Sequence, residues 1–103
     1  MTPLDRARDY AGSLRTKLGA RLKRVILFGS QARGDAKEGS DYDLVVILDK
    51  RSREAREAVL DTGVEMLNRY DQVFAALIYS EEEWRTTRRF PLGWNVEHEG
   101  IAL

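Results

Sequence analysis

The hydrophobic positions at the start of the chain follow a helical period. Apolar residues recur at steps of three and four, which places them on one face of a helix: Leu4, Ala7, Ala11, Leu14 and Leu18. Thr2 can cap this helix, and Pro3 suits its first turn. Gly19 can adopt the left-handed conformation that ends a helix. Residues 24–28, apolar after Arg24, then predict a short buried strand that leads directly into Gly29.

A glycine-rich segment and a second strand follow. Residues 29–40 hold three glycines and two serines among charged side chains, which indicates a loop or a loop with one helical turn. Residues 41–48 are polar at their start and apolar beyond, which predicts a strand that enters the core from an exposed end. The polar start of this strand is expected to face the loop.

The next segment repeats the order of helix and strand. Ser52 can cap a helix whose inner face carries small and apolar residues, with charged residues opposite: Ala55, Val59, Gly63, Met66 and Leu67. The continuous apolar run 73–79 predicts a third strand, covered by other elements on both of its faces.

Capping and breaking residues divide the C-terminal segment. Ser80 and Glu83 match a capping box that opens a short helix, and Pro91 should end that helix. Residues 92–103 are expected to form one more helical stretch, closed by Gly100. Large aromatic residues in this segment are expected to be core or interface anchors: Trp84, Phe90 and Trp94.

The order of elements predicts an α/β fold with a short mixed β-sheet and flanking helices. The chain has 103 residues, which suits a single domain over residues 1–103. Its hydrophobic fraction of 43% and charged fraction of 33% are typical of a soluble globular protein, so extensive disorder is not expected.

Charge and cysteine content narrow the function classes. Basic and acidic residues number 17 each, so the net field gives no reason to expect direct binding to nucleic acid or to an anionic membrane. Any anion site must be local. No cysteine is present, which excludes disulfides and thiol catalysis. No signal peptide or membrane span is evident, so a cytoplasmic location is expected.

The turn after the first strand has the chemistry of an anion site. Gly29 lets the backbone approach a ligand closely, and Ser30 adds a hydroxyl donor. If Ser30 starts a helical turn, its exposed N–H groups favour a phosphate. Arg33 can add a guanidinium that pairs with phosphate, or it can pair with Asp35 or another acidic neighbour instead.

The start of the second strand has the chemistry of a cation site. Asp41 and Asp43 are two residues apart, and the period of a strand sends both carboxylates to one face. Two adjacent carboxylates repel unless a cation lies between them. Mg²⁺ takes oxygen ligands from one or two carboxylates and shares its remaining positions with water and substrate phosphates. Ser40 is expected to cap or orient the Asp41 turn.

The spacing between the Gly29-Ser30 turn and the aspartate pair is a more specific signal than either feature alone. Ten residues separate Gly29-Ser30 from Asp41-x-Asp43. The stretch LFGSQARGDAKEGSDYDLVV thereby resembles the DNA polymerase beta-like nucleotidyltransferase superfamily, whose signature is G-S, ten residues, D-x-D. The order of elements is compatible with that family along the whole chain. Among its members the chain is most similar to the small stand-alone ones, the minimal nucleotidyltransferases.

The resemblance implies an activity, a cofactor and partners. The family transfers a nucleoside monophosphate from a nucleoside triphosphate, such as ATP, to a hydroxyl group, and it uses Mg²⁺. Gly29, Ser30, Arg33 and Ser40 match its nucleotide-binding segment, while Asp41 and Asp43 match its catalytic metal ligands. The small members act with a helical HEPN-domain partner, in some cases as the antitoxin of a toxin–antitoxin pair. Homo- or hetero-oligomers are compatible with this resemblance.

One family feature has no counterpart in the expected place. The family's third carboxylate usually stands on the strand after the long helix, which here places it near Ala75 or Ala76. Asp71 lies upstream and could replace it only if the strand were shifted or the loop folded back. Three hypotheses therefore stay open: a transferase that moves AMP or another nucleoside monophosphate onto a protein or small molecule, a catalytically weak antitoxin-like subunit that neutralises or positions a HEPN-domain protein, and the nucleotide-binding subunit of a larger transferase.

Overall fold

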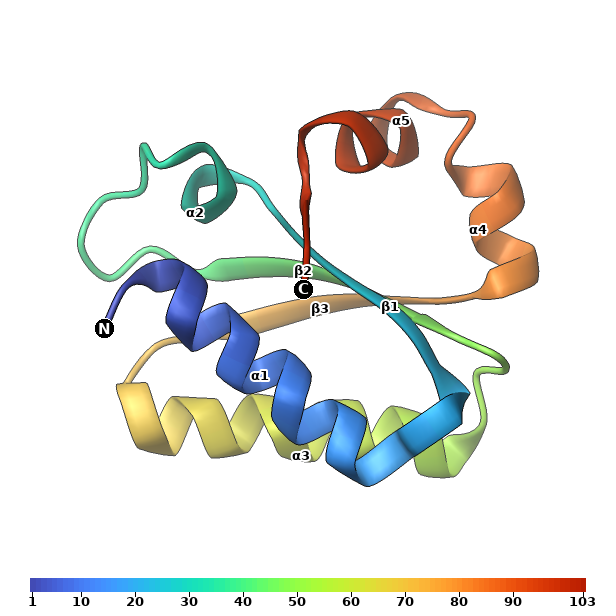
Figure 1. Ribbon diagram of the computed structural model, residues 1–103, viewed down its shortest axis with the longest axis horizontal. Helices are drawn as coiled ribbons and strands as arrows, with labels where there is room; N and C mark the ends of the chain where they lie inside the picture. The colour runs from blue at the N-terminus through green and yellow to red at the C-terminus, as the bar shows by residue number, and fades with distance from the viewer.

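A computed structural model describes all residues, 1–103, and shows a four-stranded mixed sheet flanked by helices (Figure 1). The strand order is β3-β2-β1-β4. Strand β2 runs antiparallel to β1 and parallel to β3, and β4 is antiparallel to β1. The elements are α1 (Pro3–Leu18), a 3₁₀ turn (Gly19–Arg21), β1 (Leu22–Phe28), α2 (Ser30–Arg33), β2 (Tyr42–Leu48), α3 (Arg53–Tyr70), β3 (Phe74–Ser80), α4 (Glu81–Thr87), α5 (Pro91–Glu99) and β4 (Ile101–Ala102). The predicted α/β fold class is confirmed.

The two faces of the sheet are covered by different helices. Helices α1 and α3 lie on one face, and α4 and α5 lie on the other (Figure 1). Along β2, Leu44 and Val46 pack into the core under α1 and α3, whereas Val45 and Ile47 pack with Trp84 of α4. Because side chains alternate along a strand, Asp41 and Asp43 lie on the same face as Val45. The aspartate pair therefore faces the side of α4 and α5.

The N-terminal ends of α1 and α3 form as their sequences predict. Thr2 accepts a hydrogen bond from the Asp5 backbone N–H and closes a capping box at α1. Ser52 caps α3 by accepting from the Ala55 N–H at 3.1 Å. Gly19 ends α1 at φ 55°, which suits glycine, but its ψ of −130° differs from the left-handed helical conformation expected there. Residues 29–40 contain the single helical turn α2, as expected.

Strand β3 differs from its prediction. A strand covered on both faces was expected, but Ala75 and Leu77 are exposed on the face that carries Asp43, and β3 also forms one edge of the sheet, paired only with β2. Val73, just before it, is 49% exposed, and Leu77 within it is 41% exposed. A continuous apolar run does not distinguish a central strand from an edge strand whose open side carries apolar groups.

The C-terminal segment adds a strand that was not predicted. Helix α5 starts at Pro91 and closes at Gly100, after which two residues form β4 beside β1. A Cβ at Gly100 would lie 2.5 Å from the Ile26 Cγ2, so glycine is required where the chain returns to the sheet. Of the three aromatic residues expected as anchors, Trp84 is buried in the core, whereas Phe90 and Trp94 are exposed.

No helix combines the length and apolar character that a membrane crossing requires.

Candidate functional site

The glycine turn and the aspartate pair meet at one end of the sheet. Phe28, the last residue of β1, pairs with Asp43 of β2, and Gly29 follows at φ 75°. A Cβ at Gly29 would lie 2.5 Å from the Asp43 Oδ2. Only glycine therefore combines this φ with contact between the backbone and the Asp43 carboxylate. The two halves of the sequence motif form a single site.

Helix α2 directs free N–H groups at this site. It starts at Ser30, and the N–H groups of Ala32 and Arg33 both donate to the Gly29 carbonyl at 3.1 Å. Ser30 and Gln31 occupy the first two helical positions, where an N–H has no carbonyl of its own helix to bind. Such groups at the start of a helical turn are suited to a phosphate oxygen.

The aspartate pair concentrates negative charge on one sheet face. Burial raises the pKa of the Asp43 carboxyl, the neighbouring Asp41 raises it further, and the Arg33 guanidinium acts in the opposite direction. Asp43 is half-buried and Asp41 is exposed. A cation beside both carboxylates would relieve the burial cost and the repulsion together. The donor set of two carboxylates therefore fits a hard divalent cation.

Arg33 forms one of the two alternatives expected for it, the ion pair with an acidic neighbour. Its Nε lies 3.2 Å from the Asp35 Oδ2. The side chain is nevertheless 54% exposed, lines a pocket with Gly29, and lies near enough to Asp43 to lower its pKa. An exposed ion pair of this kind contributes little to stability, so the guanidinium can exchange Asp35 for a phosphate at small cost.

Hydrogen bonds of its backbone N–H and carbonyl fix the position of Ser40. Its N–H donates to the Lys37 carbonyl at 3.0 Å, and its carbonyl accepts from the Gln31 Nε2 at 3.0 Å. Gln31 thereby ties the first turn of α2 to the residue before Asp41. The sequence reasoning missed Gln31. Its one signal was the position directly after Gly29-Ser30, where a side-chain amide can reach across the closing loop.

The place of a third carboxylate is occupied by an alanine. Ala75 pairs with Asp43 in the parallel register of β2 and β3, so its Cβ lies on the face that carries the aspartates. No third acidic, histidine or cysteine side chain joins Asp41 and Asp43, and no group of three such side chains forms elsewhere in the chain. Asp71 ends α3 in a left-handed conformation, before β3 begins at Phe74. The strand is not shifted in the way that would bring Asp71 into the site.

A pocket of about 220 Å³ lies between this site and α5. Gly29 and Arg33 form one side of it, and α5 provides the other: Leu92, Asn95, Val96 and Glu99. Phe28 completes the lining. Sequence reasoning missed Asn95 and Glu99, since neither belongs to a motif and more than fifty residues separate them from Asp43. Only the packing of α5 against β1 brings them here.

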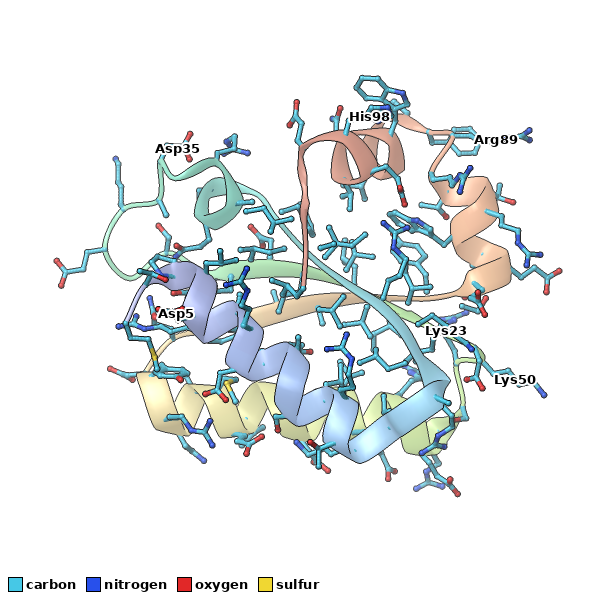
Figure 2. The ribbon with its side chains drawn as sticks, in the orientation of Figure 1. Asp5, Lys23, Asp35, Lys50, Arg89 and His98 are labelled. Atoms are coloured by element: carbon cyan, nitrogen blue, oxygen red, sulfur yellow. The ribbon has the colours of Figure 1, made fainter.

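Basic residues outside the site pair with acidic neighbours at the surface. Arg51 pairs with Glu83 at 2.8 Å and Arg53 with Glu57 at 3.1 Å. His98 lies on the outer side of α5, away from the sheet, and stacks on the Trp94 ring at 3.9 Å (Figure 2). It takes no part in the aspartate site.

Comparison with known proteins assigns the fold and the family. The model of the nucleotidyltransferase domain family matches residues 7–94. A crystal structure titled as a "putative nucleotidyltransferase" from Sulfolobus solfataricus superposes with a TM-score of 0.54 over 96% of this chain and 77% of that one, at 20% identity. At this identity the likeness concerns the fold.

Curated relatives agree with this family. A protein of Methanocaldococcus jannaschii named "putative protein adenylyltransferase" is 33% identical over 96 residues, which cover 93% of this chain and 92% of the relative. A second protein of the same name and organism is 31% identical over 75 residues, 72% of this chain and 76% of the relative. The match to the family model spans the Gly29-Ser30 turn, the aspartate pair and strands β1 to β3, so the chain belongs to the nucleotidyltransferase domain family.

Proposed function

We propose that this chain is a Mg²⁺-dependent adenylyltransferase that moves AMP from ATP to a hydroxyl group. The observation that carries the proposal is the close approach of the Asp43 carboxylate to Gly29, which leaves no room for a Cβ there. It supports a single site in which the Gly29-Ser30 turn would bind phosphate and the aspartate pair a cation, both on one triphosphate. Neither half alone would distinguish a transferase from an ordinary strand end.

Asp41 and Asp43 would hold the metal ion, and they fit it because burial and the neighbouring Asp41 raise the pKa of the Asp43 carboxyl, an effect that a cation would oppose. When bound, the ion neutralises charge on the phosphate oxygens and helps to activate the attacking hydroxyl. Ser30 and Gln31 N–H groups and the Arg33 guanidinium would bind the remaining phosphate oxygens. The chain's own contribution is thus to position and neutralise the triphosphate.

The transfer exchanges one bond to the α-phosphorus of ATP for another. The hydroxyl oxygen of the acceptor bonds to this phosphorus, and the bond from the phosphorus to the bridging oxygen breaks. Pyrophosphate leaves with that oxygen, and the hydroxyl proton passes to solvent or to a nearby base. The geometry at Gly29 serves this step by keeping the triphosphate against the aspartate face of the sheet.

The pocket under α5 would receive the nucleoside. Phe28 and Leu92 supply apolar surface for a flat base, and the exposed amide of Asn95 can both donate to and accept from a base edge. Adenine presents a donor beside an acceptor, which an asparagine amide can match. This arrangement supports ATP as the donor nucleotide.

The acceptor we propose is a hydroxyl on a HEPN-domain protein in the cytoplasm. Two observations support a protein acceptor. The relatives from Methanocaldococcus jannaschii carry the name of protein adenylyltransferases. The aspartate pair also lies at an open end of the sheet, with Asp41 and Ala75 both exposed, which leaves room for a side chain of another protein.

A second candidate function is a nucleotide-binding subunit with weak catalysis, which acts on its HEPN-domain partner as an antitoxin mainly by contact. Ala75 favours it, because this residue pairs with Asp43 where the family usually has its third carboxylate. Such a subunit would still bind ATP with Mg²⁺. It would differ from the transferase in turnover alone.

Transfer of label from α-labelled ATP to a co-expressed partner in the presence of Mg²⁺ tests the proposal. The wild type should label the partner, and Asp43→Ala should reduce labelling at least about hundredfold, since it removes a cation ligand. Asp49→Ala is the matched control, because Asp49 is an exposed aspartate just beyond the other end of β2. Equal labelling by wild type and Asp43→Ala would exclude the assigned site.

A binding measurement separates the two candidates. Both predict that a fluorescent ATP analogue binds the wild type in a Mg²⁺-dependent manner and binds Asp43→Ala poorly. Binding without any transfer would support the contact-only subunit. If the Asp41→Ala, Asp43→Ala double variant no longer protected cells from the partner, contact alone would not be the mechanism.

A further inference from the structure

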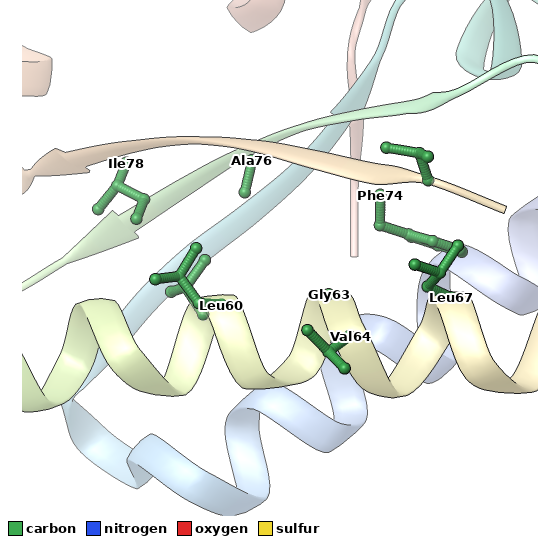
Figure 3. A pocket seen from close by; sticks show the side chains of 9 residues that line it. Leu60, Gly63, Val64, Leu67, Phe74, Ala76 and Ile78 are labelled. Carbon is green, nitrogen blue, oxygen red and sulfur yellow. The ribbon is translucent and has the colours of Figure 1, made fainter.

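An apolar groove lies on the side of the molecule away from β4, between α3 and β3 (Figure 3). Its cavity measures about 250 Å³, and eight of its nine lining residues are hydrophobic. Leu60 and Val64 on the helix are 67% and 57% exposed, and Val73 beside the strand is also open to solvent. Single exposed apolar residues are ordinary, but a contiguous apolar groove marks a contact surface.

The strand that borders the groove is an unprotected edge. Strand β3 has a neighbour only on the β2 side, so one row of its backbone N–H and C=O groups faces outward. Native edge strands usually carry a charge, a proline or a bulge that prevents pairing with another chain. The sequence of β3, FAALIYS, contains no charge and no proline. The edge is therefore free to accept another strand.

The side of α3 that faces α1 forms ion pairs within the chain. Arg69 pairs with Asp9 of α1, and Glu65 pairs with Lys17 of α1 at 3.1 Å. The groove side of α3 has no such partner. It is a second, separate side of the helix, and nothing in the chain covers it.

From the charges along the groove we propose that its occupant is a second copy of this chain. Three apolar residues of α3 line the groove, Leu60, Val64 and Leu67, and charged residues flank them: Arg56 one helical turn before Leu60, and Asp71, which caps α3, four residues after Leu67. This line is basic at its start, apolar in its middle and acidic at its end. Arg56 and Asp71 are both exposed, and neither forms an ion pair within the chain.

The line is complementary to itself when a second copy runs antiparallel. Val64 then faces Val64 of the second copy, Leu60 faces Leu67, and Arg56 faces Asp71. The same two-fold axis, perpendicular to the sheet, also sets β3 antiparallel to β3 of the second copy. One symmetry operation thus satisfies the apolar groove, the charges and the open strand edge, as an isologous dimer interface requires.

The aspartate face stays open in this dimer. The groove lies on the α1 and α3 side of the sheet and at the edge of β3, whereas Asp41 and Asp43 point to the α4 and α5 side. The proposal therefore does not depend on the nucleotide site. A dimer without transferase activity, or an active monomer, would separate the two conclusions.

Sedimentation equilibrium of the purified chain, across a wide concentration range, tests the proposal. The wild type should show a reversible dimer. Val64→Lys should weaken the dimer at least about hundredfold, because it places two like charges against each other at the two-fold axis. Thr86→Lys on α4 is the matched control, since it adds the same charge to an exposed helical site outside the groove. Circular dichroism confirms that each variant is folded.

Charge exchange identifies the orientation of the two copies. Arg56→Glu alone should weaken the dimer about tenfold, because it brings two pairs of acidic groups together. The double variant Arg56→Glu, Asp71→Lys should recover most of that loss. A wild type that stays monomeric at every concentration would overturn the proposal, as would a Val64→Lys dimer as tight as the wild type. A failure of the double variant to recover association would overturn the antiparallel arrangement.

Discussion

Asp43 occupies an environment that disfavours its own negative charge. Burial and the neighbouring Asp41 both raise the pKa of its carboxyl, and the Arg33 guanidinium offsets only part of that effect. Above the pKa the folded chain must carry this charge at a cost that the unfolded chain avoids. Ionisable groups whose charge is disfavoured in the free protein are characteristic of binding and catalytic sites, where a bound ligand stabilises that charge.

Asp43→Asn should therefore stabilise the metal-free protein at neutral pH while it abolishes nucleotide binding. A carboxyl whose pKa is higher in the folded state destabilises that state at pH values above it, and asparagine removes this charge. The gain in free energy of unfolding should be below about 1 kcal/mol, because solvent screens the half-buried group. Urea denaturation with EDTA measures it.

Asp49→Asn is the control for that measurement. Its carboxylate is exposed beyond the far end of β2 and accepts a hydrogen bond from the Lys50 N–H at 2.6 Å, so its loss should not stabilise the protein. A destabilised Asp43→Asn protein, or one that still bound ATP in a Mg²⁺-dependent manner, would contradict the assignment of Asp43.

Ala75→Asp should restore the missing carboxylate. The parallel register places this side chain beside Asp43 on the same face of the sheet. We expect tighter Mg²⁺ binding and at least about tenfold faster transfer to the partner, since a third ligand stabilises the cation that activates the hydroxyl. Leu77→Asp, two residues further along the same face, is the control. Faster transfer in the control but not in Ala75→Asp would show that the site lies elsewhere.

At the scale of single elements, helix ends follow from the sequence because a cap involves residues at most three positions apart. Thr2, Ser52 and Ser80 all accept the hydrogen bonds that their spacing predicts. The environment of β3 did not follow, because strand order depends on contacts between segments distant in the chain. The two-residue strand β4 carries too short a pattern to be recognised, and it forms only because β1 offers it an edge.

The capping box at Ser80 is expected to hold α4 in place. The Ser80 hydroxyl accepts from the Glu83 N–H at 3.1 Å, and the Ser80 N–H donates to the Glu83 carboxylate at 2.8 Å. Ser80→Ala removes the first bond and should cost about 1 kcal/mol of unfolding free energy. Urea denaturation measures this loss.

The Ser52 cap of α3 provides a comparison for the Ser80 cap of α4. Ser52→Ala on α3 should cost a similar amount, because Ser52 accepts one equivalent bond from the Ala55 N–H. Ser80→Ala should also increase solvent quenching of the buried Trp84 one turn further along α4. An unchanged stability for Ser80→Ala together with a loss for Ser52→Ala would show that α4 is held by packing alone.

At the scale of the whole molecule, the candidate site joins residues 28–43 to helix α5, which lies near the other end of the sequence. The Gly29-Ser30 turn and the aspartate pair were predicted because they lie within one short motif. The α5 side of the pocket was not, because Asn95 and Glu99 reach it only through the fold. That packing depends on Glu97, whose carboxylate accepts from the Arg24 guanidinium and the Trp84 indole N–H, both at 2.6 Å. One side chain thus ties α5 to β1 and to α4.

Glu97→Gln should reduce the sensitivity of the fold to acid and weaken nucleotide binding. The Arg24 guanidinium, with help from the Trp84 N–H, lowers the pKa of the Glu97 carboxyl below its ordinary 4.5. A carboxyl with a lowered pKa stabilises the folded state above its unfolded pKa, and this stabilisation is lost as the pH falls through its folded pKa. Glutamine has no charge to lose there, so the unfolding free energy should fall less steeply with acid.

In the variant, the unfolding free energy should still fall with acid, though less steeply, because the pKa values of Asp9 and Glu65 are also lowered by hydrogen bonds and cationic neighbours. Near neutral pH the variant should lose no more than about 1 kcal/mol, since the pair is partly exposed. Urea denaturation at several pH values measures the slope, and ATP titration measures the pocket. An unchanged slope with unchanged ATP affinity would show that Glu97 neither stabilises the fold nor positions α5, and the pocket would then depend on β4 and on the packing of Val96 in the core cluster with Ile26 and Trp84.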